Sequence, residues 1–159
     1  MIILGVDPGT AITGFGLIRC WRGKIQLVDH GSIKTSQKDN APKRLDLIYR
    51  QALAILREYK PQVMAIESLF FNTNAKSATA VGQAMGVLKL AAERKKIKVF
   101  DYPPLKIKMS LTGNGRAKKK KVQEKVRKML RLKETPRPTH AADALAVAIC
   151  HWQERKKVE

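Results

Sequence analysis

The chain has 159 residues, enough for one domain with a substantial core, and 44% of them are hydrophobic. Its 32 Lys and Arg residues against 13 Asp and Glu residues give a formal net charge of +19, which favours a polyanionic partner, most simply nucleic acid. No apolar run approaches the ~20 residues of a membrane span, and no basic amphipathic helix with bulky apolar anchors points to membrane-surface binding. Composition alone leaves ribosome-like packing on RNA open as an alternative.

The start of the chain and its two cysteines give an expectation for its location. Residues 1–6 are too few for a secretory leader and lack its basic residues. Cys20 and Cys150 are far apart and match neither a disulfide framework nor the spacing of a zinc site. We therefore expect a cytoplasmic protein with free thiols.

Three strands are predicted in the first 35 residues. The apolar run Ile2–Val6 is typical of a buried strand, and the DPGT sequence at residues 7–10 is typical of the turn that ends it. The segments Thr13–Arg19 and Lys24–Thr35 are expected to pair as a hairpin, with the Arg-Gly dipeptide between them as its turn.

Strands and helices alternate in the rest of the chain. The predicted elements are a helix from Pro42 to about Tyr59, a strand Val63–Glu67, a helix capped by Asn74 that runs to about Arg94, a strand Ile97–Tyr102, a short helix that begins at Pro103-Pro104, a loop Thr112–Gly115, a basic amphipathic helix Lys118–Leu132 and a last helix to about Glu154. Three antiparallel strands followed by this alternation predict an α/β fold with a five-stranded mixed sheet flanked by helices. We assign residues 1–154 to this single domain and residues 155–159 to a short basic tail.

Three carboxylates stand out because each lies within or just after a run that otherwise predicts core. Asp7 follows IILGV, Glu67 follows VMAI, and Asp143 lies within AADALAVAI. Each has an ordinary alternative, as a turn residue, a solvent-facing strand end or a first-turn acid that complements the helix dipole. Together they favour a site, because buried carboxylates need partners and the carboxyl ends of parallel strands meet at one sheet edge.

The last predicted helix also carries His140, three residues before Asp143, so both side chains share one face of its first turn. The small and apolar residues that follow allow this helix to lie close to the sheet. A lone histidine in such a helix is more often a core residue than a ligand. Beside three carboxylates, His140 becomes a candidate metal ligand.

Carboxylates that are brought together repel one another unless divalent cations lie between them. Oxygen-rich sites suit Mg²⁺ or Mn²⁺. Two such ions can activate the attacking water and stabilise the leaving oxygen of a phosphodiester. An acidic metal site inside a strongly basic protein therefore predicts a nuclease.

Three segments, in order and with fitting spacing, resemble the RuvC family of bacterial Holliday-junction endonucleases. They are GVDPGTAITGFGLI near the start, AIESLFFNTNAKSATAVGQAMGVL in the middle and HAADALAVAI near the end, and the similarity extends from about Ile3 to His151. The resemblance implies an RNase H-like fold of the retroviral-integrase superfamily and a homodimer. It also implies Mg²⁺-dependent, paired nicks in two strands of like polarity at a four-way junction, a role in homologous recombination and DNA repair, and a branch-migration partner of the RuvA and RuvB type.

Carried over residue by residue, the resemblance makes Asp7, Glu67 and Asp143 metal ligands of the catalytic site, with two ions bound. The most familiar family members have an aspartate where this chain has His140, although some have histidine. Because an imidazole nitrogen is a softer ligand than a carboxylate oxygen, we expect Mn²⁺ to support cleavage better than Mg²⁺.

The resemblance also marks residues for contact with DNA and with a second subunit. Phe70 and Phe71 follow Glu67, and one of them, by resemblance Phe70, is expected to stack on a base opened at the crossover; the alternative is one core and one surface aromatic. The expected phosphate contacts are Lys108, Arg116, Lys118, Lys119, Lys120 and Lys121, although a charge run is usually only a solvated face. Ala78, Gly82 and Gly86 recur at i, i+4 and i+8, which permits close approach of a partner helix or, alternatively, of the sheet.

Two other function classes remain open from the sequence. The GVDPGT sequence also resembles the first phosphate loop of actin-like and sugar-kinase ATPases, but those enzymes bind nucleotide between two such domains and no second phosphate loop is evident here. A non-catalytic junction or RNA binder is the other alternative. It would tolerate the loss of any of the four site residues.

Overall fold

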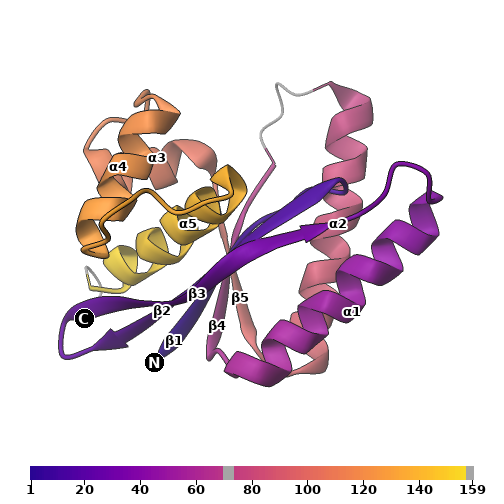
Figure 1. The fold of residues 1–159 in the computed structure, drawn as a ribbon, viewed down its shortest axis with the longest axis horizontal. Helices are drawn as coiled ribbons and strands as arrows, with labels where there is room; N and C mark the ends of the chain where they lie inside the picture. The colour runs from indigo at the N-terminus through magenta and orange to yellow at the C-terminus, as the bar shows by residue number, and fades with distance from the viewer. Residues whose placement is uncertain (70–73, 157–159) are drawn as a thin grey trace.

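The computed structural model describes residues 1–69 and 74–156, and in it a five-stranded sheet is covered by helices on both faces (Figure 1). The strands are β1 Ile2–Asp7, β2 Ile12–Trp21, β3 Lys24–Lys34, β4 Val63–Glu67 and β5 Lys98–Tyr102, in the spatial order β3-β2-β1-β4-β5. The first three strands are antiparallel, and β4 and β5 run parallel to β1. The predicted mixed sheet is therefore confirmed.

The helices are α1 Ala41–Tyr59, α2 Ala75–Arg94, α3 Pro104–Thr112, α4 Lys119–Met129 and α5 Thr139–Lys156. Figure 1 shows α1 and α2 on one face of the sheet and α3, α4 and α5 on the other. Each face has its own apolar core, one built with α1 and α2 and the other with α3, α4 and α5. None of the helices that the structure describes has both the length and the hydrophobicity needed to cross a lipid bilayer.

The helix ends agree with the sequence prediction to within three residues. Asn40 caps α1 by accepting a hydrogen bond from the Lys43 backbone N–H at 2.9 Å, and Asn74 caps α2 in the same way. The predicted end of the basic helix at Leu132 is wrong. The helix α4 ends at Met129, because the backbone turns at Arg131, which has a φ of 55°.

The last helix, α5, packs directly on β1 and β2. Ten of its residues are buried, and five of these ten are alanines. The strands present glycines to it: a Cβ built at Gly5 would lie 2.0 Å from the Ala144 carbonyl oxygen, and one at Gly14 would lie 2.0 Å from the His140 carbonyl oxygen. Glycine on the strands and alanine on the helix therefore let the first turn of α5 reach the end of β1 (Figure 1).

Candidate active site

Asp7 and Glu67 are the last residues of two adjacent parallel strands. The β1–β4 register pairs Val6 with Ile66, so the next residue of each strand lies at the same level of the sheet. Four residues of each strand before the acid are buried, and the acids themselves are only partly covered. The strands thus hold two carboxylates side by side at the carboxyl edge of the sheet, where open α/β folds place their sites.

The first turn of α5 brings the other two predicted residues to the same edge. His140 Nδ1 lies 2.9 Å from Asp7 Oδ2, across 133 residues of sequence. One possible ligand atom from each of Asp7, His140 and Asp143 lies within 4.8 Å of the others, a spacing that permits shared coordination of a cation. The donor set is rich in oxygen with a single imidazole nitrogen, which suits Mg²⁺ or Mn²⁺.

The electrostatics of these carboxylates are those of a crowded, partly buried site. Burial and the nearby Asp7 charge raise the pKa of Glu67 to about 8, and a hydrogen bond with Asp7 adds to the effect. Burial also raises the pKa of Asp7, against the hydrogen bond from His140 that lowers it. Repulsion between the acids is thus a real cost that a bound cation would remove.

The four residues line a cleft of about 330 Å³ together with Pro104, Ile107, Lys108, Lys119, Val122 and Ala146. Within the predicted lysine run, Lys119 makes a specific contact: its ammonium nitrogen lies 2.5 Å from Asp143 Oδ2. Lys118, Lys120 and Lys121 are exposed and lie outside the cleft lining, as does Arg116. Phe70 and Phe71 lie outside the described residues.

Hydrogen bonds hold the loop that follows Asp7. The Thr13 hydroxyl donates to the Gly9 carbonyl at 2.7 Å, and Thr13 is almost fully buried. The Thr35 hydroxyl donates to the Thr10 carbonyl at 2.5 Å, and its backbone N–H donates to Ala11 at 3.0 Å. The position of the Asp7 loop is therefore set by β2 and β3 as well as by β1.

Comparison with known proteins decides the family. The model of the family "Crossover junction endodeoxyribonuclease RuvC" matches residues 3–151. The chain belongs to the RuvC family. The RuvC of Thermotoga petrophila is 49% identical over 151 residues, which are 95% of this chain and 92% of that one, and the RuvC of Rubrobacter xylanophilus is 48% identical over 150 residues, which are 94% and 84%.

Solved structures agree with this RuvC assignment. The Thermus thermophilus RuvC structure superposes with a TM-score of 0.92 at 35% identity, covering 99% of this chain and 97% of that one. A T. thermophilus RuvC in complex with a Holliday junction substrate gives a TM-score of 0.90 at 33% identity, covering 99% and 96%. The RNase H-like fold predicted from the RuvC resemblance is thereby confirmed.

The sequence analysis missed two features of this RuvC site. It treated the four lysines from Lys118 to Lys121 as equivalent, whereas only Lys119 reaches the acids. It also missed the apolar walls that Ile107 and Val122 form. Spacing along the lysine run does not single out Lys119, because Lys118 lies four residues and Lys119 three residues before Val122, and both spacings bring a side chain near Val122 on the helix surface.

Proposed function

We propose that the chain resolves Holliday junctions by metal-dependent hydrolysis of phosphodiester bonds, with paired symmetric nicks in strands of like polarity. The observation that supports this proposal is the convergence of Asp7, Glu67, His140 and Asp143 in one cleft of a RuvC-family fold. A T. thermophilus relative has been solved with a Holliday junction substrate. The net charge of +19 suits the same polyanionic substrate.

In this proposal the four residues would hold two divalent cations, and such ions would supply activation of the attacking water and stabilisation of the leaving oxygen. Asp7 and Asp143 supply oxygen ligands from two different elements, and His140 supplies a nitrogen. Glu67 must lose its proton to act as a ligand, since its pKa lies near 8. Lys119 is already paired with Asp143 and would neutralise charge beside the metals.

Mg²⁺ is the expected cofactor, and Mn²⁺ is expected to support cleavage better than Mg²⁺. The structure fits this choice through its donor set, in which His140 stands 2.9 Å from Asp7 at the position of a potential ligand. An imidazole nitrogen binds Mn²⁺ in preference to Mg²⁺.

Contacts with the DNA outside the metal site are also part of the proposal. Lys108 and Lys119 line the cleft, and in this proposal they would contact phosphates next to the scissile bond. Lys118, Lys120, Lys121 and Arg116 are exposed beside it and would contact the neighbouring duplex. Phe70 and Phe71, which lie outside the described residues, remain candidates for stacking on a base at the crossover.

A two-fold symmetric junction that needs two matched cuts favours a C₂ homodimer. The stripe of Ala78, Gly82 and Gly86 on α2 supports this, because a Cβ at Gly86 would meet no atom within 4 Å and the exposed Leu90 continues the stripe by one turn. From the composition and length of the chain, we also propose a cytoplasmic location and one domain over residues 1–154 with a tail at 155–159. The resemblance alone suggests a bacterial source and a branch-migration partner of the RuvA and RuvB type.

Cleavage of a labelled synthetic four-way junction, with a linear duplex as control, tests the function directly. The parent protein should cut the junction at paired positions with Mg²⁺ or Mn²⁺ and not in EDTA. Asp143→Asn should still bind the junction but cut it about a thousandfold more slowly, since removal of a metal ligand costs about 4 kcal/mol of transition-state stabilisation.

Two outcomes would contradict the proposal. Equal cutting by Asp143→Asn and the parent would show that the site is assigned to the wrong residues. Junction binding by the parent without any metal-dependent cutting would instead favour a non-catalytic junction binder.

A further inference from the structure

A second basic surface lies at the sheet edge that carries the catalytic acids. We name it the β3–α1 segment, residues 34–44. Since β1 and β3 are both antiparallel to β2, they end at the same edge. The segment leads into α1, which covers the face of the sheet opposite to α3 and α4 (Figure 1). The cleft edge is therefore flanked by basic residues on both faces.

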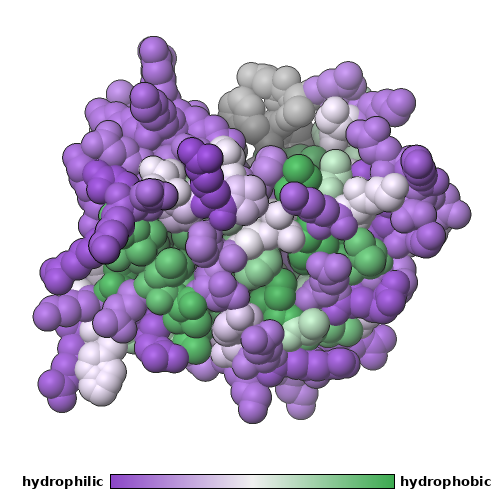
Figure 2. Space-filling model, viewed as in Figure 1, coloured by the Kyte–Doolittle hydropathy of each residue, from purple (hydrophilic) through white to green (hydrophobic). Residues whose placement is uncertain are grey.

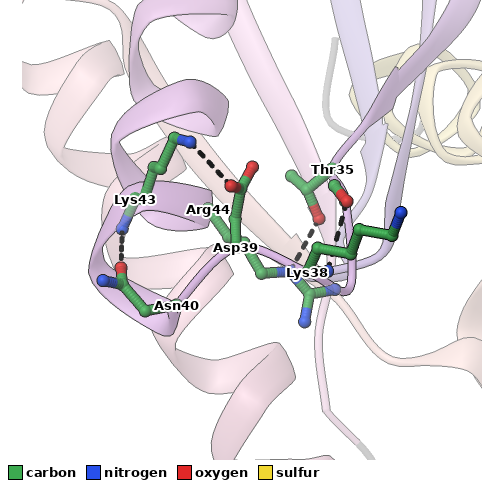
Figure 3. Close-up of polar contacts among 7 residues, drawn as sticks. Thr35, Lys38, Asp39, Asn40, Lys43 and Arg44 are labelled. Atoms are coloured by element: carbon green, nitrogen blue, oxygen red, sulfur yellow. Dashed lines mark hydrogen bonds and ion pairs between the residues drawn. The ribbon is translucent and has the colours of Figure 1, made fainter.

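Hydrogen bonds join this segment to the catalytic loop. Arg44 Nε donates to the Thr35 hydroxyl oxygen at 2.8 Å, as Figure 3 shows. The Thr35 hydroxyl in turn donates to the carbonyl of Thr10, three residues after Asp7. Two hydrogen bonds thus lead from α1 to the loop that begins at a catalytic acid.

The charge of the segment is unbalanced and exposed. It contains four cationic side chains and one acid. That acid, Asp39, forms an ion pair with Lys43, with 2.7 Å between Asp39 Oδ1 and Lys43 Nζ. Lys34 and Lys38 are exposed, and neither ammonium has an acidic partner among the described residues. In Figure 3 the Lys38 side chain extends away from Asp39 and Arg44.

We propose that the β3–α1 segment binds the phosphate backbone of a second arm of the branched substrate. Its Lys34 and Lys38 side chains would contact phosphates on this arm, while Lys108 and the α4 lysines contact the arm in the cleft. This inference rests on the proposed function, because it specifies how that same substrate is held.

The position of the β3–α1 segment relative to the cleft also affects the selectivity for branched over linear DNA. The two basic surfaces flank the same edge of the sheet from its opposite faces. In this proposal a straight duplex bound along the cleft would follow one direction and would contact the α3–α4 side. The arms of a four-way junction diverge from the crossover, so one arm can lie on each face. The β3–α1 segment therefore adds affinity for branched DNA that linear DNA does not receive.

The salt dependence of binding tests this proposal. The double variant Lys34→Gln/Lys38→Gln removes both exposed cations. A matched control, Lys24→Gln/Arg57→Gln, removes two charges from the opposite ends of the same elements, the start of β3 and the last turn of α1. Binding of labelled four-way junction and linear duplex would be followed by fluorescence anisotropy over a range of salt concentrations, in EDTA to prevent cleavage.

Each phosphate contact contributes about 0.9 to the slope of log K against log salt. We expect the Lys34→Gln/Lys38→Gln slope to fall by about 1.8 on the junction and to stay unchanged on the duplex, with neither slope changed in the control. A junction slope equal to that of the control would overturn the inference. So would equal losses on junction and duplex, which would indicate cation contacts without selectivity. If the parent bound no four-way junction, the proposed function itself would fail.

Discussion

Asp7 lies within reach of three other ionisable groups of the site, one on the neighbouring strand and two on α5. Its carboxylate contacts His140 at 2.9 Å and shares a hydrogen bond with Glu67, and the Asp143 charge acts on it as well. A single buried acid at this position would be an unexplained cost to stability. Three carboxylates and one imidazole that face one cleft are instead explained by a cation site. The ionisation of these groups should govern both the stability of the protein and its affinity for metal.

The raised pKa of Glu67 predicts how the free energy of unfolding of the metal-free protein changes with pH. Its pKa is about 8 in the folded state and near 4.5 as an unperturbed group. Between these values the folded state binds more protons than the unfolded state, so this contribution to the free energy of unfolding decreases as pH rises, by up to about 1.4 kcal/mol per pH unit. Urea unfolding in EDTA at pH 5.5 and pH 8 should show the loss in the parent and a flatter profile in Glu67→Gln. A parallel profile in the variant would contradict this origin.

The imidazole of His140 leads to a prediction about which ion, Mn²⁺ or Mg²⁺, supports faster cleavage. Replacement by aspartate in His140→Asp restores a hard oxygen ligand, so the ratio of the Mn²⁺-supported to the Mg²⁺-supported cleavage rate should fall about tenfold. Single-turnover rates on a four-way junction, titrated with each metal, provide the measurement. An unchanged ratio would show that His140 does not select the ion.

At the scale of elements, the contact of α5 with β1 and β2 determines whether the site assembles. The helix lies so close to the strands that Gly5 and Gly14 face its backbone, and the His140 carbonyl itself occupies the space beside Gly14. Ridges of larger side chains on the strands would lift the helix and carry His140 and Asp143 away from Asp7.

Gly5→Ala tests this close packing. Its new methyl group would lie 2.0 Å from the Ala144 carbonyl oxygen, which belongs to a helix backbone and cannot rotate away. We expect a loss of about 3 kcal/mol in the free energy of unfolding, measured by urea denaturation.

Gly31→Ala on β3 is the matched control for that substitution. Its methyl group would meet the Phe15 ring at 2.9 Å, and a side chain can shift where a backbone cannot. The loss should stay near 1 kcal/mol. Equal losses in the two variants would contradict a close helix–strand contact as the cause.

At the scale of the whole molecule, two matched cuts require two active sites in fixed relation. In the proposed dimer, the small residues of α2 and its exposed Leu90 would face the partner subunit, whereas the buried side of α2, which includes Ala84, Met85 and Leu88, packs in the core. This division of the helix into two apolar sides is typical of an element that packs both within a subunit and between subunits.

Gly86→Arg should therefore convert a dimer into a monomer. A long charged side chain at the open Gly86 position would prevent close approach of a second α2, while leaving the subunit folded. Sedimentation velocity would measure the change, and paired nicking of a four-way junction should be lost with it. Ser77→Arg, at an exposed position on the opposite side of α2, should stay dimeric. A monomeric parent would remove the proposed interface.

The sequence by itself determined the order of strands and helices, the covering of the sheet by helices and the acids that lie at its edge. These features depend on the hydrophobic periodicity of each segment and on the rarity of unpaired buried charges. Both can be recognised within one segment, without knowing which other elements pack against it. The carboxylates at Asp7, Glu67 and Asp143 could be selected in this way. The end of α4 could not, because Arg131 adopts its positive φ only in the context of the packed turn.

Tertiary structure alone decided which residues meet. The choice of Lys119 from four adjacent lysines depends on the rotation of α4 against α5, and the contact of His140 with Asp7 joins positions 133 residues apart. The link from Arg44 through Thr35 to the Asp7 loop likewise depends on the pairing of β3 with β2. Such contacts are set by the packing of whole elements, and neither spacing nor composition along the chain encodes the rotation and register of that packing.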